Sequence, residues 1–176
     1  TYGLTPDLMT IAKGMTGGYL PAGGLMVADR VADPVIEHAG EFFHGYTWAA
    51  HPAACAAGLA TLRIMREERL VERVTETLAP KLAALWAELG EHPLVGEART
   101  QGLLGALEIV ADKTTLARFA PEAEAGPRAR DLAVANGLVM RAVGDTLVIS
   151  PPYAITEAEL DDLAARARAT LDALAD

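Results

Sequence analysis

The most constraining feature of this sequence is the spacing of apolar residues between Leu70 and Leu89. Large apolar side chains recur there at intervals of three and four, with charged residues between them: Leu70, Val71, Val74, Leu78, Leu82, Leu85, Trp86 and Leu89. This spacing puts them on one face of a helix, so we predict an amphipathic helix that lies on a surface. Gly90 and Pro93 end it, and Pro80 is expected to kink it because proline removes a helix hydrogen bond.

After Pro93 the pattern alternates between strand-like and helix-like segments. Gly137 suits a helix C-terminus, and Gly144-Asp145 suits a type II′ hairpin turn. Thr156 and Glu159 form the two ends of a capping box. The predicted elements are strands 95–101 and 103–110, a helix 122–136, strands 138–143 and 146–149, and a helix from 156 onward. This part therefore reads as a small α/β layer of helices on a short sheet.

Residues 1–68 differ from the rest of the chain in their pattern of apolar and small residues. This part begins with a short apolar strand, continues through a glycine-rich loop, and ends in a helix that is apolar or small nearly all round. The predicted segments are a buried strand 8–12, the loop 14–24, a strand 25–28, a helix 31–37 and a buried helix 52–65. We therefore divide the chain into residues 1–68 and 69–176, and the fold class is α/β. The first part has too few strands to complete a sheet by itself.

Composition excludes several classes of protein. Of the 176 residues, 51% are hydrophobic and 22% charged, which supports a folded core. The net charge of -9 argues against nucleic-acid binding, and one cysteine excludes a disulfide framework or a cysteine zinc cluster. No apolar run approaches the roughly 18 residues of a membrane helix. We expect a cytoplasmic globular protein with neither a nucleic-acid nor a membrane partner.

Lys13 is the first candidate for chemistry among the chain's three lysines. It follows the apolar strand and precedes Gly14, whereas Lys81 and Lys113 are expected to be solvated. In a buried site its amine would be desolvated, which favours the neutral nucleophile that forms Schiff bases. The alternative is a lysine that reaches from the strand end to solvent.

Two further polar residues each have a functional and a structural interpretation, and two others have only a structural one. Thr47, in the segment 43–48, offers a hydroxyl for an anion near a helix N-terminus, or it only caps that helix. Arg141, between two valines in a strand, is either a carboxylate clamp or an edge residue that reaches solvent. Cys55 is expected to be small and buried, and His92 has no partner that the sequence identifies.

These separate features occur together in an order that resembles the class III aminotransferases. Residues 6–15 (PDLMTIAKGM) and 18–24 (GYLPAGG) are similar to that family's lysine segment. Residues 45–48 (GYTW), followed by His51-Pro52, resemble its phosphate-contact segment. Residues 137–145 (GLVMRAVGD) and 150–152 (SPP) resemble the C-terminal segment of ω-transaminases of the amine:pyruvate or β-alanine:pyruvate type.

The resemblance implies a fold and a set of roles. The fold would be that of PLP-dependent transferases of fold type I, with residues 1–68 ending the large cofactor-binding domain and residues 69–176 forming the small C-terminal domain. Lys13 would hold pyridoxal 5′-phosphate through a Schiff base, and Thr47 would bind its phosphate in the neighbouring subunit's site, lined also by Tyr46. Arg141 would pair with a substrate carboxylate. These enzymes are homodimers with shared active sites.

The resemblance also implies a reaction and a missing part. An amino group would pass from a primary amine or ω-amino acid to a keto acid such as pyruvate. Family members are well over twice as long, and the aspartate that pairs with the cofactor's pyridine nitrogen lies upstream of Thr1 in them. An aminomutase or decarboxylase on the same scaffold is an alternative, as is a non-catalytic fragment or interaction module.

Overall fold

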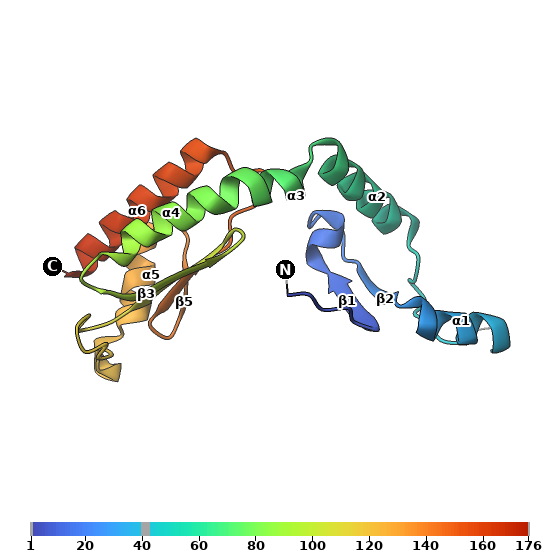
Figure 1. Ribbon diagram of the computed structural model, residues 1–176, viewed down its shortest axis with the longest axis horizontal. Coiled ribbons are helices and arrows are strands. Elements are labelled where there is room, and N and C mark those ends of the chain that lie inside the picture. The colour runs from blue at the N-terminus through green and yellow to red at the C-terminus, as the bar shows by residue number, and fades with distance from the viewer. Residues whose placement is uncertain (1, 40–42, 176) are drawn as a thin grey trace. The chain divides into compact units, whose positions relative to one another are not determined.

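The computed structural model describes residues 2–39 and 43–175, which form two compact units. The first comprises Thr1–Arg69 and the second Leu70–Asp176. Figure 1 shows the elements of each unit along the coloured chain. Assigning these units to the large and small domains of a fold type I enzyme remains a prediction.

The first unit contains a two-stranded antiparallel sheet. Strand β1 (Leu8–Ala12) pairs with β2 (Gly23–Val27), and the register runs from Leu8 opposite Val27 to Ala12 opposite Gly23. The 3-10 helix η1 (Lys13–Thr16) and a glycine-containing turn connect them. The predicted strand 8–12 is confirmed, and the second strand begins two residues earlier than predicted.

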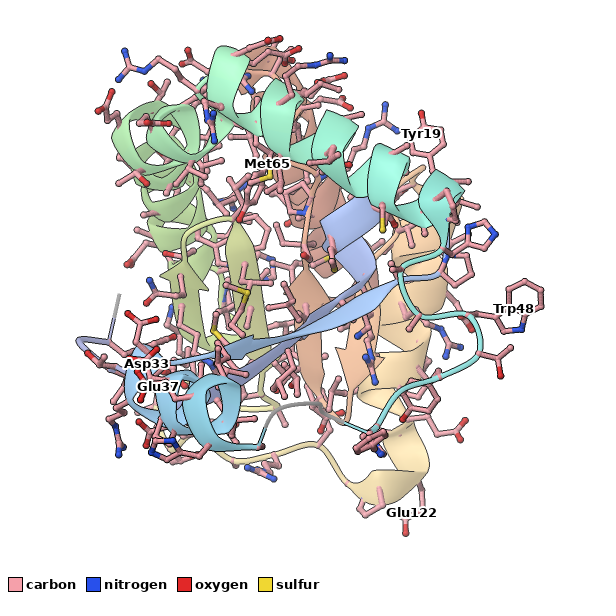
Figure 2. All side chains as sticks on the ribbon, turned by 90° about the vertical axis from the view of Figure 1, so that its right-hand side faces the viewer. Tyr19, Asp33, Glu37, Trp48, Met65 and Glu122 are labelled. Carbon is pink, nitrogen blue, oxygen red and sulfur yellow. The ribbon has the colours of Figure 1, made fainter. Side chains whose placement is uncertain are left out.

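Two helices complete this unit, namely α1 (Asp29–His38) and α2 (Pro52–Glu67). The prediction that α2 is buried is wrong for the described residues: within it only Gly58 is buried, while Leu59 is 68% exposed. The predicted burial of β1 is wrong as well, because most of its residues are exposed. Each strand has one pairing partner, and no second layer among the described residues covers the pair. Tyr19 and Trp48 likewise extend away from the ribbon (Figure 2).

The second unit begins with the predicted amphipathic helix, whose regular α-helical hydrogen bonding is interrupted just before Pro80. Helix α3 (Leu70–Arg73) passes into a π-helical stretch (Val74–Leu78) and then into α4 (Ala79–Gly90). The Ala79 amide donates to the carbonyl of Val74, five residues earlier. Pro80 has no amide hydrogen to donate, and in a regular α-helix its ring would clash with the carbonyl of Glu76; the wider preceding turn relieves this clash. The predicted irregularity therefore takes the form of a π-bulge.

A four-stranded antiparallel sheet forms the centre of the second unit. Its strands are β3 (Val95–Gln101), β4 (Leu104–Ile109), β5 (Arg141–Val143) and β6 (Thr146–Ile149), in the order β3-β4-β6-β5. One face carries Leu107 opposite Leu147, both fully buried. Helices α4 and α6 (Glu157–Ala175) lie side by side (Figure 1), and together with α5 (Ala125–Ala135) they supply much of the rest of the core.

Local capping predicted from the sequence is present at two helix ends. After α5, the Leu138 amide donates to the Ala133 carbonyl and the Gly137 amide to the Val134 carbonyl, while Gly137 has φ +75°. That is a Schellman motif, and it needs a residue that tolerates positive φ. Before α6, the Thr156 amide donates to Glu159 Oε2 at 2.7 Å and the Glu159 amide to Thr156 Oγ1 at 3.2 Å, which confirms the capping box.

No helix within residues 2–39 and 43–175 is long and apolar enough to cross a membrane.

Candidate active site

Lys13 lies directly after β1, as the first residue of η1. Its backbone is left-handed, with φ +55°, and the preceding Ala12 is fully extended at φ -161°. A non-glycine residue in the left-handed region is uncommon and carries a strain of order 1 kcal/mol, and such residues gather at functional sites.

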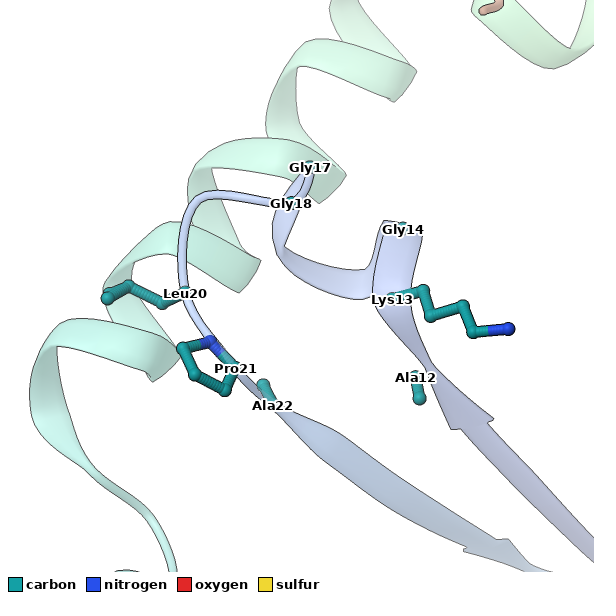
Figure 3. A pocket seen from close by; sticks show the side chains of 8 residues that line it. All are labelled: Ala12, Lys13, Gly14, Gly17, Gly18, Leu20, Pro21 and Ala22. Atoms are coloured by element: carbon teal, nitrogen blue, oxygen red, sulfur yellow. The ribbon is translucent and has the colours of Figure 1, made fainter.

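The lysine borders a hollow of about 750 Å³ whose other lining residues are mainly small: Ala12, Gly14, Gly17, Gly18, Leu20, Pro21 and Ala22. Thr16 is buried, and its hydroxyl donates to the Leu20 carbonyl at 2.5 Å, which closes the loop on itself. Figure 3 shows the Lys13 amine extended away from the Leu20–Ala22 side of this hollow. Lys13 lines the hollow but is exposed, which agrees with the alternative of a lysine that reaches from the strand end to solvent.

The three lysines differ in what their amines contact. Lys81 Nζ lies 2.8 Å from Asp161 Oδ2, and its side chain is 25% exposed. Lys113 Nζ donates to the carbonyls of Gly90 and His92, so it caps the C-terminus of α4 and the expectation of a solvated lysine is wrong. In the part of the chain that the structure describes, Lys13 is the lysine whose amine has no hydrogen bond or ion pair.

Thr47 and Tyr46 lie on the segment that leads into α2. Both are exposed, Tyr46 to 83%, and Thr47 begins a turn that runs to Ala50. The cap of α2 is His51, whose Nδ1 accepts from the Ala54 amide at 3.4 Å. The alternative in which Thr47 caps this helix is therefore wrong, and its hydroxyl is available for another contact.

Arg141 is the first residue of β5, on the sheet face opposite the core. It pairs with Val148, which pairs with Ala106, and that residue pairs in turn with Arg99, so these side chains form one row across the sheet. Arg99 is held by Glu97 at 2.5 Å and lies 3.7 Å from Glu108. Arg141 is exposed, and no described residue forms an ion pair or hydrogen bond with it. An unpaired guanidinium on an open face retains all its donors for a ligand.

The segment before Arg141 is anchored to α6. Arg166 Nη1 donates to the Asn136 carbonyl at 2.9 Å, and Arg166 Nε donates to Asp162 Oδ2 at 2.7 Å. The hydrogen bond that Arg166 donates to Asp162, together with the negative charge of Asp162, raises the pKa of Arg166 above its usual value. Through the Asn136 carbonyl, Arg166 therefore links α6 to the turn at Gly137.

The comparisons with known proteins agree with one another. A family model described as aminotransferase class-III matches residues 1–171. The chain belongs to the class III aminotransferases. It is 48% identical over 171 residues to the putrescine–pyruvate aminotransferase of Pseudomonas aeruginosa, covering 97% of this chain and 37% of that protein. A diaminobutyrate–2-oxoglutarate transaminase of Halomonas elongata is 38% identical, with 99% of this chain and 38% of that protein covered.

Solved class III structures share the fold. A thermostable (S)-enantioselective ω-transaminase from Thermomicrobium roseum matches 99% of this chain and 39% of its own, with 38% identity and a TM-score of 0.88. The PMP-bound form of an aminotransferase from Vibrio fluvialis matches 98% and 39%, with 31% identity and a TM-score of 0.90. The predicted fold type I is confirmed. The chain spans 37–38% of the length of the two curated relatives.

His92 and Cys55 are two further residues whose environment was predicted from the sequence. His92 is 6% exposed, and its Nδ1 accepts from the Leu94 amide while its Nε2 lies 3.1 Å from Asp172 Oδ1, a partner that the sequence did not reveal. Cys55 is exposed, so its predicted burial is wrong. No group of three or more His, Cys, Asp or Glu residues that could hold a metal occurs in the described ranges.

Proposed function

We propose that the protein to which this chain contributes is a pyridoxal-phosphate-dependent transaminase. It would move an amino group from a primary amine or ω-amino acid to a keto acid, with pyruvate as the acceptor. The observation that carries the proposal is Lys13: an amine without a partner, at a strand end with φ +55°, beside a hollow lined mainly by small residues. The names of the two curated relatives support an aliphatic diamine or amino acid as donor.

The residues of the first unit fit the aldehyde and phosphate of such a cofactor. Lys13 supplies an accessible primary amine for the aldehyde, and Gly14, Gly17 and Gly18 add no side chains to the lining of the hollow beside it. Thr47 offers an exposed hydroxyl that the helix cap does not use, and Tyr46 stands beside it. In the homodimer that we expect, Thr47 would serve the site of the neighbouring subunit. The bound cofactor would supply an electron sink that makes the substrate carbon acidic.

Proton transfer is the step that we assign to Lys13. As a free amine, its Nζ would take the proton from the carbon that bears the substrate amine and release it to the accepting carbon. A position at the end of a strand suits this work because the backbone stays fixed while the four-carbon stem moves the amine. Lys81 and Lys113 cannot replace it, since each is engaged in its own contacts.

Recognition of the keto acid is the step that we assign to Arg141. A guanidinium presents parallel N–H donors that match a carboxylate, and such a charged pair is stronger than a neutral hydrogen bond. The neighbouring side chains in its row, Val148 and Ala106, offer no competing acid. That Arg141 faces the site of Lys13 is part of the proposal.

Reductive labelling of the full-length protein tests the proposal. Borohydride reduction after incubation with pyridoxal 5′-phosphate should attach the cofactor to the peptide that contains Lys13. Lys13→Ala should abolish alanine formation from pyruvate and putrescine, whereas Lys81→Ala, the matched control, should retain it. Labelling of Lys81 or Lys113, or full turnover by Lys13→Ala, would overturn the assignment.

A further inference from the structure

The N-terminus of α5 is capped by a residue that does not belong to its own segment. The residue at the N-cap position, Glu124, has a left-handed backbone with φ +46° and forms no side-chain cap. The Gly126 amide donates instead to Asp145 Oδ1 at 3.1 Å, across 19 residues of sequence. A carboxylate at this position satisfies a free amide and also complements the positive end of the helix dipole.

The turn that carries Asp145 is seated directly on α5. A Cβ placed on Gly126 would lie 1.9 Å from the Gly144 carbonyl oxygen and 2.9 Å from its carbon. Both contacts are to backbone, which cannot move aside as a flexible side chain would. Gly126 is buried, so the absence of a side chain there is what permits the β5–β6 turn to approach the helix.

The same turn is also tied to the neighbouring strand. The Asp145 carbonyl accepts from the Ile109 amide at 2.8 Å, at the end of β4. The turn itself has positive φ only at Gly144, as a type II′ turn requires. Asp145 is therefore held through its side chain by a helix and through its backbone by a strand.

These contacts act on the strand that presents Arg141. Strand β5 is three residues long, lies at the edge of the sheet, and pairs only with β6. Such a strand gains little restraint from its own ladder, so its position depends on the packing of Ala142 against the core and on how its two ends are held. One end is set by the Schellman turn at Gly137 and the other by the seated turn at Asp145.

We propose that Asp145, seated against Gly126, is a positioning residue for Arg141 and thereby helps to set the affinity for the keto acid. The inference rests on the proposed function, in which Arg141 binds the substrate carboxylate. Asp145 itself would not contact the substrate. It keeps the edge strand in the place from which the guanidinium meets both carboxylate oxygens, which a bidentate contact requires.

The test compares Asp145→Ala and Asp145→Asn in the full-length enzyme. Asp131→Ala is the matched control, because Asp131 is an exposed aspartate on the same helix that pairs with its neighbour Arg130. Asp145→Ala should raise KM for pyruvate about three- to tenfold through misplacement of the arginine. It should leave KM for an amine without a carboxylate unchanged, and Asp145→Asn, which keeps an acceptor oxygen, should recover part of the loss.

Two further measurements separate positioning from a general loss of structure. In an Arg141→Ala background, Asp145→Ala should have no additional effect on KM for pyruvate. Hydrogen exchange at the Gly126 amide should accelerate in Asp145→Ala and not in Asp131→Ala. An equal loss for both substrates, a loss that persists without Arg141, or unchanged exchange at Gly126 would overturn the inference alone. If Arg141→Ala itself spares pyruvate, the carboxylate assignment falls, and the inference with it.

Discussion

Replacement of Arg141 by alanine gives the sharpest prediction for recognition of the acceptor. The exposed Arg141 has no partner among the described residues, so its removal should cost the fold less than about 0.5 kcal/mol, as for ordinary surface substitutions. The effect of removing Arg141 on catalysis should be larger than its effect on stability. A charge-assisted bidentate pair is worth roughly 1.5–3 kcal/mol, which corresponds to about one to two powers of ten in kcat/KM for pyruvate.

The assay measures each half-reaction separately in the full-length enzyme. Arg141→Ala should slow the reaction with pyruvate and spare an apolar amine that has no carboxylate. Arg141→Lys should recover only part of the loss, because an ammonium cannot form two parallel hydrogen bonds. Arg128→Ala is the matched control, since Arg128 is another exposed arginine of the second unit and forms no ion pair with a described residue. Equal losses for both substrates, or a large drop in thermal stability, would show that Arg141 supports the fold and would refute the reasoning.

Two further predictions concern stability. Lys113→Met should lower the free energy of unfolding by about 1–2 kcal/mol, measured by urea titration, because the carbonyls of Gly90 and His92 lose a charged donor; no loss would contradict the capping role. The Thr156 amide and hydroxyl hold the pKa of Glu159 below its usual 4.5. The folded protein therefore binds fewer protons at Glu159 than the unfolded chain does. The resulting stabilisation of the fold is present above pH 4.5 and is lost as the pH falls through the lowered pKa. Glu159→Gln should therefore lower Tm at neutral pH and match the unsubstituted protein in acid, whereas a Tm difference that persists in acid, or that also follows Glu122→Gln, would exclude this origin.

Much of the local structure could be predicted from the sequence, because the decisive interactions span few residues. The stop at Gly137 and the capping box at Thr156 each depend on groups at most five residues apart. The strand at Leu8–Ala12 could be predicted from its short apolar run, although its pairing partner is more than ten residues away. The bulge before Pro80 follows from the chemistry of one side chain acting on the turn before it. The lysine segment was specific enough to indicate the family, which the comparisons confirm.

Burial and long-range hydrogen bonds were decided only by the tertiary structure, because they depend on partners that are distant in sequence. Whether β1 and α2 are covered is a property of the layers around them, and no periodicity within a helix or strand reports on those layers. The sequence predicts a solvated Lys113 because its two carbonyl partners lie 21 and 23 residues away. It indicates no partner for His92 because Asp172 is 80 residues away. Asp145 read as an ordinary turn residue until the fold brought it to the N-terminus of α5. Capping and periodicity are local and are therefore encoded in short segments, whereas burial and long-range hydrogen bonds exist only once separate segments pack together.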